Sequence, residues 1–101
     1  MSAHLNFIKL DVSQLAPPEP MTVILTHLAK LVEGDCLLIK HRRQPFPLYE
    51  KLSEAGFLYH CEVHTDDNIS LFIFHQKLQR VFNHWLKMHD MASMSSEKGE
   101  D

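Results

Sequence analysis

Three side chains that can ligate a divalent metal alternate along one predicted strand: His60, Glu62 and His64. Alternate residues of a strand point to the same face of a sheet, about 7 Å apart from one to the next. Two imidazoles and a carboxylate suit zinc, iron or another divalent metal, with a further ligand such as His75 from elsewhere. The alternative interpretation is a solvated outer face that carries two exposed histidines.

A second set of polar residues falls where the first two predicted strands end. If these strands are parallel neighbours, as a β-α-β unit requires, their C-terminal ends lie at one edge of the sheet. That edge would bring together Asp11, Ser13, Glu19, His41, Arg42 and Arg43. Arg42 and Arg43 are suited to hold a carboxylate, a phosphate or an oxidised-sulfur anion. The alternative is structural: an ion pair between an arginine and Asp or Glu that braces the loop.

The two cysteines, Cys36 and Cys61, each fall in a predicted strand, and the chain has no CxxC pair. Isolated cysteines in strands usually behave as small buried apolar residues. This pattern favours a reducing compartment, and we expect a cytoplasmic protein. Sulfur relay through Cys36 or Cys61 is the alternative function that the thiols leave open.

The elements that must position these residues follow from apolar periodicity and from turn residues. Strands are predicted at residues 5–11, 36–40, 57–65 and 69–75, and helices at 18–33, 47–55 and 76–89. Gly34 and Gly56 are helix stops, and the segment Asp66-Asp67-Asn68 indicates a hairpin turn. Proline is tolerated in the first turn of a helix, so the run from Pro17 to Pro20 can open one.

The order β-α-β-α-β-β predicts a two-layer α/β sandwich, in which two helices cover one face of a four-stranded mixed sheet. The last strand is apolar on both sides, so the second face also needs cover. The amphipathic helix at 76–89, with Phe82, Trp85 and Leu86, is expected to supply it within the chain or across a dimer. We divide the chain into a domain at 1–75, a helical extension at 76–90 and a disordered tail at 91–101.

The proline run and the segment before it resemble the motif of a known protein family. Leu10-Asp11-Val12-Ser13-Gln14-Leu15 leads through Ala16 into Pro17-Pro18-Glu19-Pro20. This resembles the TusA-like (SirA-like) sulfur carriers, in which Leu-Asp-x-x-x-Leu leads into Cys-Pro-x-Pro at a helix N-terminus. Pro17 stands where that family has its nucleophilic cysteine. The pattern His41-x-Arg43-x-Pro45, followed by Leu48, is similar to the cysteine-less branch, a domain of unknown function.

The resemblance spans about residues 5–75 and implies the sandwich fold without implying an activity. Members of that branch are sometimes joined to haemerythrin-like di-iron domains, which implies a redox or metal-handling setting. A sulfur carrier needs a thiolate, and proline supplies no nucleophile. The prolines also lack N–H donors, and Glu19 adds negative charge, so the turn is a poor phosphate cradle.

The charge and the apolar content of the chain argue against two classes of partner, nucleic acids and membranes. The 101 residues carry a net charge of −3 with neutral histidines, and no lysine-rich face or arginine stripe is visible. Nucleic-acid binding through phosphate neutralisation is therefore not expected. No apolar run approaches the roughly 20 residues of a membrane helix, and the N-terminus lacks a signal-peptide pattern.

The sequence therefore predicts a non-catalytic binding or accessory module, a monomer or homodimer, whose partner is another protein or a small anionic ligand. Its expected recognition residues are Asp11, Glu19, His41, Arg42 and Arg43. No cofactor is expected, and a divalent metal at His60, Glu62 and His64 is the further alternative.

Overall fold

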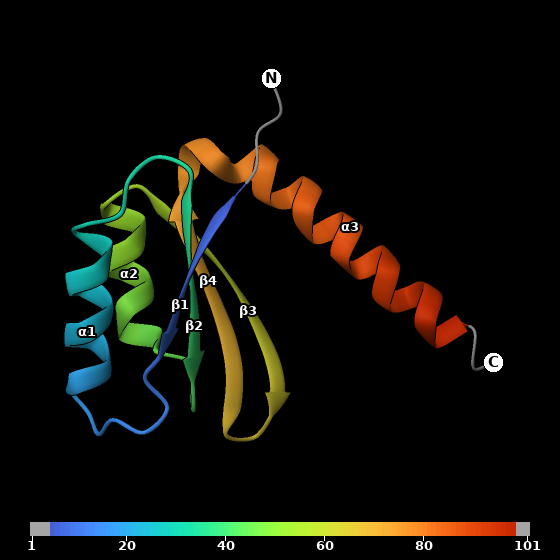
Figure 1. Ribbon diagram of the computed structural model, residues 1–101. Helices are drawn as coiled ribbons and strands as arrows, with labels where there is room; N and C mark the ends of the chain where they lie inside the picture. Colours follow the sequence, from blue (N-terminus) through green and yellow to red (C-terminus); the bar gives the residue numbers. More distant parts are fainter. Residues whose placement is uncertain (1–4, 99–101) are drawn as a thin grey trace.

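A computed structural model describes residues 5–98 of the chain, with side chains described as far as His89. The elements are β1 (Asn6–Asp11), α1 (Glu19–Leu28), β2 (Asp35–His41), α2 (Phe46–Glu54), β3 (Phe57–Thr65), β4 (Asn68–His75), the 3₁₀ turn η1 (Gln76–Leu78) and α3 (Gln79–Lys98). Their order confirms the predicted α+β fold with a four-stranded mixed sheet (Figure 1).

The sheet has the strand order β1-β2-β4-β3. Strand β1 runs parallel to β2, with Asp11 opposite Lys40, while β4 pairs antiparallel with both β2 and β3. The predicted parallel pair is thus present, and the C-terminal ends of β1 and β2 lie at one edge. This arrangement brings the residues after β1 close to those after β2.

Both α1 and α2 lie on one side of the sheet (Figure 1). Apolar residues one turn apart, such as Ile24 with Leu28 and Leu48 with Leu52, turn one stripe of each helix inward. The buried core on this face comprises Val12, Ile24, Leu28, Leu37, Ile39, Leu48, Leu52, Leu71 and Ile73. The prediction that two helices share one face is confirmed.

One end of the opposite face is covered by α3, which lies on the other side of the sheet from α1 and α2 (Figure 1). Its core comprises Leu5, Cys36, Phe72, Phe74 and Phe82. Phe82 stacks on Phe74 with ring centroids 4.2 Å apart, and Trp85 packs on Phe7 at 4.9 Å. The predicted cover is therefore present within one chain, and Trp85 is half-buried in it.

Helix α1 ends at Leu28, five residues before the predicted end at residue 33. The chain then tightens, because Lys30 and Leu31 donate N–H bonds to the carbonyls three residues back, at His27 and Leu28. The Asp35 carboxylate accepts from the Val32 N–H at 3.1 Å, and Gly34 adopts a φ of +96°. This turn takes residues 31–34 out of the helix. Leu31 nevertheless packs against the core, which is why its helical spacing misled the prediction.

Helix α3 continues to Lys98, nine residues past the predicted end at His89. The segment Gln79–Lys98 contains neither glycine nor proline, and alanine and methionine favour helix. The predicted disordered tail at 91–101 is therefore corrected for residues 91–98, which are helical. Its remaining part, 99–101, lies outside the described residues.

Candidate functional site

A hollow of about 290 Å³ lies where β1 and β2 end and α1 begins. Its lining residues are Val12, Ser13, Leu15, Pro17, Pro20, His41, Arg42 and Arg43. We call it the arginine hollow. Four of the residues that the sequence brings to this edge, Ser13, His41, Arg42 and Arg43, take part in it. The parallel pairing of β1 with β2 is the reason that they meet.

Asp11 belongs to the support of the arginine hollow rather than to its lining. Its carboxylate accepts from the backbone N–H of Ser13 at 2.9 Å and from the Ser13 hydroxyl at 2.6 Å. These two hydrogen bonds hold the pKa of Asp11 below its ordinary value. Glu19, the first residue of α1, is exposed and is also not among the lining residues. The prediction placed both carboxylates at the correct edge, but neither faces the hollow.

His41 holds the start of the loop after β2. Its Nδ1 atom accepts the backbone N–H of Arg42 at 2.8 Å and that of Arg43 at 3.3 Å. Burial, with the nearby positive charge of Arg42, lowers the pKa of His41, which favours the neutral ring. Because Nδ1 accepts, the single proton of that ring belongs on Nε2. His41 thus fixes the loop backbone and keeps one N–H donor.

The loop is braced without the charge of either arginine. Tyr49 donates its hydroxyl to Oε1 of Gln44 at 3.0 Å, which ties the loop to α2. Arg42 and Arg43 are both exposed, and within residues 5–89 neither side chain has an ion pair or a hydrogen bond. The alternative interpretation of an Arg–carboxylate brace is therefore wrong. Gln44 and Tyr49 do the bracing, and sequence reasoning missed them because their pairing depends on how α2 packs.

The proline turn shapes the arginine hollow but supplies no donor to it. Pro17 and Pro20 lie in its wall, and the Glu19 N–H is occupied by the carbonyl of Ala16 at 2.9 Å. The N-cap residue of α1 is Pro18, with no side-chain cap. An anion in the hollow would therefore be met by guanidinium groups and the His41 ring rather than by a helix N-terminus.

A protein-family model described as "Uncharacterized conserved protein (DUF2249)" matches residues 9–75. The chain belongs to this family. The matched segment is about two thirds of the chain and includes every residue of the arginine hollow, whereas α3 lies outside it. The comparisons with curated proteins and with solved structures gave no match.

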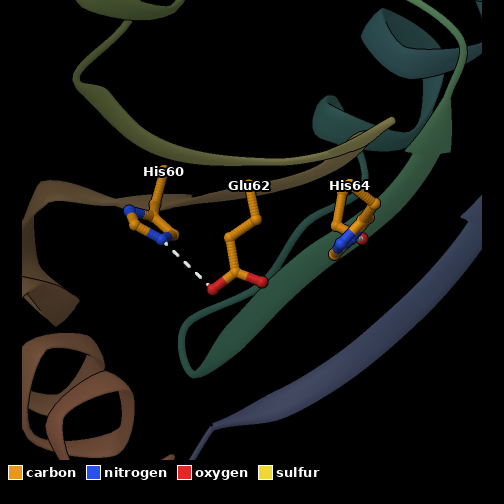
Figure 2. Close-up of polar contacts among 4 residues, drawn as sticks. His60, Glu62 and His64 are labelled. Carbon is orange, nitrogen blue, oxygen red and sulfur yellow. Dashed lines mark hydrogen bonds and ion pairs between the residues drawn. The ribbon is translucent and has the colours of Figure 1, made fainter. Parts of the chain in front are cut away.

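The predicted metal ligands of this DUF2249 chain share a face but do not converge. Figure 2 shows His60 and Glu62 turned toward one another, with Nε2 and Oε2 3.4 Å apart. His64 lies apart from them, and its Nε2 contacts Oγ of Ser70 at 2.8 Å. His75 accepts from the Lys77 N–H at the far end of β4. Within the described part of the chain, no three His, Cys, Asp or Glu side chains are grouped to hold a metal.

The face carrying His60 is only partly covered by α3. The His60 ring lies 5.8 Å from the rings of both Phe72 and Phe82, whereas His64, farther along β3, is exposed. Cover by the helix and an exposed histidine thus occur on the same face. Helix α3 in fact covers one end of this face and leaves the other end open.

The two thiols of the DUF2249 chain lie away from the arginine hollow. Cys36 is fully buried in β2 under α3, and burial raises its pKa to about 12. Cys61 lies on the other face of the sheet, and burial raises its pKa as well. Both groups are therefore protonated thiols at neutral pH, the unreactive form. Across residues 5–98, no helix is long and apolar enough to cross a membrane.

Proposed function

We propose that this DUF2249 chain is a TusA-like module that does not transfer sulfur and instead binds an anionic group at the arginine hollow. The anionic group belongs to a small ligand or to a partner protein. The single observation that carries the proposal is the pair of arginines beside the hollow with no carboxylate partner in the described residues. Pro17, at the cysteine position of the sulfur carriers, supports the absence of sulfur transfer.

The geometry suits recognition rather than catalysis. A guanidinium group presents several N–H donors in a fixed plane and matches the two oxygens of a carboxylate or phosphate. The loop backbone beneath the two arginines is fixed by His41 and by the Gln44–Tyr49 bond. A preorganised loop loses less conformational entropy when the anion binds. Ser13 is 7% exposed and its hydroxyl donates to the Asp11 carboxylate within the turn after β1, so we assign this pair a structural role.

Two alternatives from the sequence have weaker support. Sulfur relay through Cys36 or Cys61 needs an accessible thiolate, and burial raises the pKa of both thiols. Divalent-metal binding is supported only by the His60–Glu62 pair. A metal ion there would need further ligands, because no third His, Cys, Asp or Glu side chain in the described residues is grouped with the pair. A cytoplasmic location is part of our proposal, and the two free cysteines support it.

The test is an NMR titration of the ¹⁵N-labelled chain with succinate, inorganic phosphate and sulfite. We expect saturable shifts at the amides of Ser13, Arg42 and Arg43, and binding at least roughly tenfold weaker for the variant Arg42→Ala/Arg43→Ala. The control Lys77→Ala/Arg80→Ala removes the same charge at exposed positions outside the hollow. Equal loss in both double variants, or no shifts with any anion, would refute anion binding at this site.

A further inference from the structure

Large apolar side chains gather in the open beside the two arginines. Of six exposed large apolar residues in the described part of the chain, three lie here. Phe46 is 65% exposed, Val63 62% and Tyr59 43%. Scattered exposed apolar residues are ordinary on a soluble protein, but a contiguous group marks an interaction surface. None of these three belongs to the arginine hollow, so that site does not account for them.

A second hollow, of about 510 Å³, separates Phe46 from Val63. It is lined by Arg42, Arg43, Gln44, Phe46, Val63, Thr65, Asp66 and Ile69, and we call it the apolar hollow. Arg42 and Arg43 line both hollows, so the two sites adjoin across the loop after β2. The apolar hollow is shallow and open to solvent rather than enclosed.

The aromatic wall of this surface is fixed by ring contacts. Tyr59 stacks on Tyr49 with centroids 3.7 Å apart and planes at 7°, and Tyr49 meets Phe46 edge to face at 5.7 Å. The Tyr49 hydroxyl in turn holds Gln44 in the arginine loop. Tyr49 thus links the exposed aromatic rings to the loop that carries the two arginines. Rigid aromatic residues beside arginine are the side-chain types enriched at the energetic centres of protein interfaces.

Charge selects the kind of partner. The lining of the apolar hollow contains one carboxylate, Asp66, and two arginines that have no ion pair within the described part of the chain. A small inorganic anion would use the guanidinium groups but would leave the apolar surface exposed. A ligand that satisfies both halves must combine negative charge with an adjacent apolar group. A linear protein segment with an acidic residue beside a large apolar one has this composition.

We propose that the apolar hollow and the arginine hollow together dock an acidic linear segment of a partner protein. A carboxylate of the segment lies on Arg42 and Arg43, and a neighbouring apolar side chain fills the space between Phe46 and Val63. This inference rests on the proposed function, because it assigns the anionic group to a peptide and adds an apolar contact. The apolar contact is what separates a peptide from a free anion.

The experiment is selection of a display library of short random peptides on the wild-type chain. We expect enriched peptides to place Asp or Glu next to Leu, Ile, Val, Met or Phe. Affinity of the best peptide should fall roughly tenfold or more in Phe46→Ser and in Arg42→Ala/Arg43→Ala. It should be unchanged in Val32→Ser, a matched control that is 66% exposed and lies outside both hollows. Asp66→Asn should tighten binding, because it removes the opposing charge.

The outcomes separate the inference from the proposed function. Enriched peptides that lack acidic residues, or that bind Phe46→Ser as well as wild type, overturn the peptide inference, while phosphate or succinate shifts at Arg42 and Arg43 still support anion binding. Loss of those shifts overturns both. If sedimentation shows a dimer that Phe46→Ser dissociates, the occupant is a second copy of this chain and the inference is wrong. Circular dichroism of each variant establishes that it is folded.

Discussion

At the scale of single residues, His41 determines the conformation of the loop that carries Arg42 and Arg43. Its Nδ1 atom accepts two backbone N–H groups, which fixes the chain directly after β2, where both arginine side chains are exposed. Only the neutral imidazole can accept at Nδ1. Burial and the charge of Arg42 both favour that neutral form, as the lowered pKa of His41 records. The charge of Arg42 thus helps to keep the His41 ring neutral, and that neutral ring in turn holds the backbone of Arg42.

The lowered pKa of His41 predicts a pH dependence of stability. The folded chain holds this ring below its ordinary pKa of 6.5, so in that window the unfolded chain binds more protons. The contribution of His41 is complete above pH 6.5 and decreases as the pH falls from 6.5 through the folded pKa. Urea unfolding of wild type and His41→Gln on both sides of pH 6.5 measures it. We expect wild type to lose more stability on acidification than the variant. Parallel curves would contradict the role of His41.

The thiols yield a second prediction at this scale. Because burial raises the pKa of Cys36 to about 12 and also raises that of Cys61, neither supplies a thiolate at neutral pH. Incubation of the folded chain with a persulfide donor should therefore give no stable one-sulfur adduct by intact-mass measurement. The same chain unfolded in urea should react, which serves as the control. A stoichiometric adduct on the folded chain would restore the sulfur-relay alternative.

Sequence reasoning located much of the site because the chain order determines it. Parallel pairing of β1 and β2 brings Ser13, His41 and the two arginines together whatever their rotamers. Rotamers and local hydrogen bonds determine the rest. The carboxylate of Asp11 turns back to Ser13, and His64 turns to Ser70 rather than to Glu62. Alternation along a strand predicts a shared face, but it does not predict convergence on one point.

At the scale of elements, the apolar surface went unpredicted for a different reason. Tyr59 and Val63 lie on the face of β3 that the two helices were expected to cover. Helix α2 is short, and its Tyr49 reaches Tyr59, whereas Val63 lies beyond it and stays exposed. Apolar alternation shows which face a residue occupies, while the length and position of the covering helix decide whether it is buried. One available signal was Phe46, an apolar residue between two prolines.

The contact between α3 and the sheet carries a prediction of stability. Phe82 is 1% exposed and lies between Phe74 and Phe72, so its truncation leaves a cavity in the second core. We expect Phe82→Ala to lower the free energy of unfolding by about 3–5 kcal/mol. Met88→Ala, at an exposed position of the same helix, should change it by less than about 0.5 kcal/mol. Urea unfolding measures both. Similar small losses would mean that α3 is not docked.

At the scale of the whole molecule, the sheet has two differently covered faces. Helices α1 and α2 close one face with an aliphatic core, and α3 closes part of the other through aromatic stacking. The candidate recognition surface lies at the end of the sheet where β1 and β2 finish, beside the start of α2. The arginines and Phe46 of the recognition surface are exposed, although the buried core residues Val12 and Ile69 also line its two hollows. Changes at the arginine loop should alter binding while leaving the melting temperature nearly unchanged, because exposed charges contribute little to folding.

Two truncations test whether α3 completes the fold. The described contacts of the C-terminal segment with the sheet come from Leu78, Val81, Phe82, Trp85 and Leu86. Deletion of residues 76–101 uncovers Phe72 and Phe74, at up to about 150–250 Å² for each aromatic side chain. We expect that variant to aggregate or to lose cooperative unfolding.

Deletion of residues 90–101 is the matched control, since it keeps every contact just named. It should remain monomeric in sedimentation and unfold at the same urea concentration as the full chain. If the longer deletion is equally soluble and stable, the second face does not need its cover, and α3 is an appendage to a domain that ends at His75. If the shorter deletion alone destabilises the chain, the last turns of α3 make contacts that a single copy does not provide, and a dimer through α3 becomes the better account of that face.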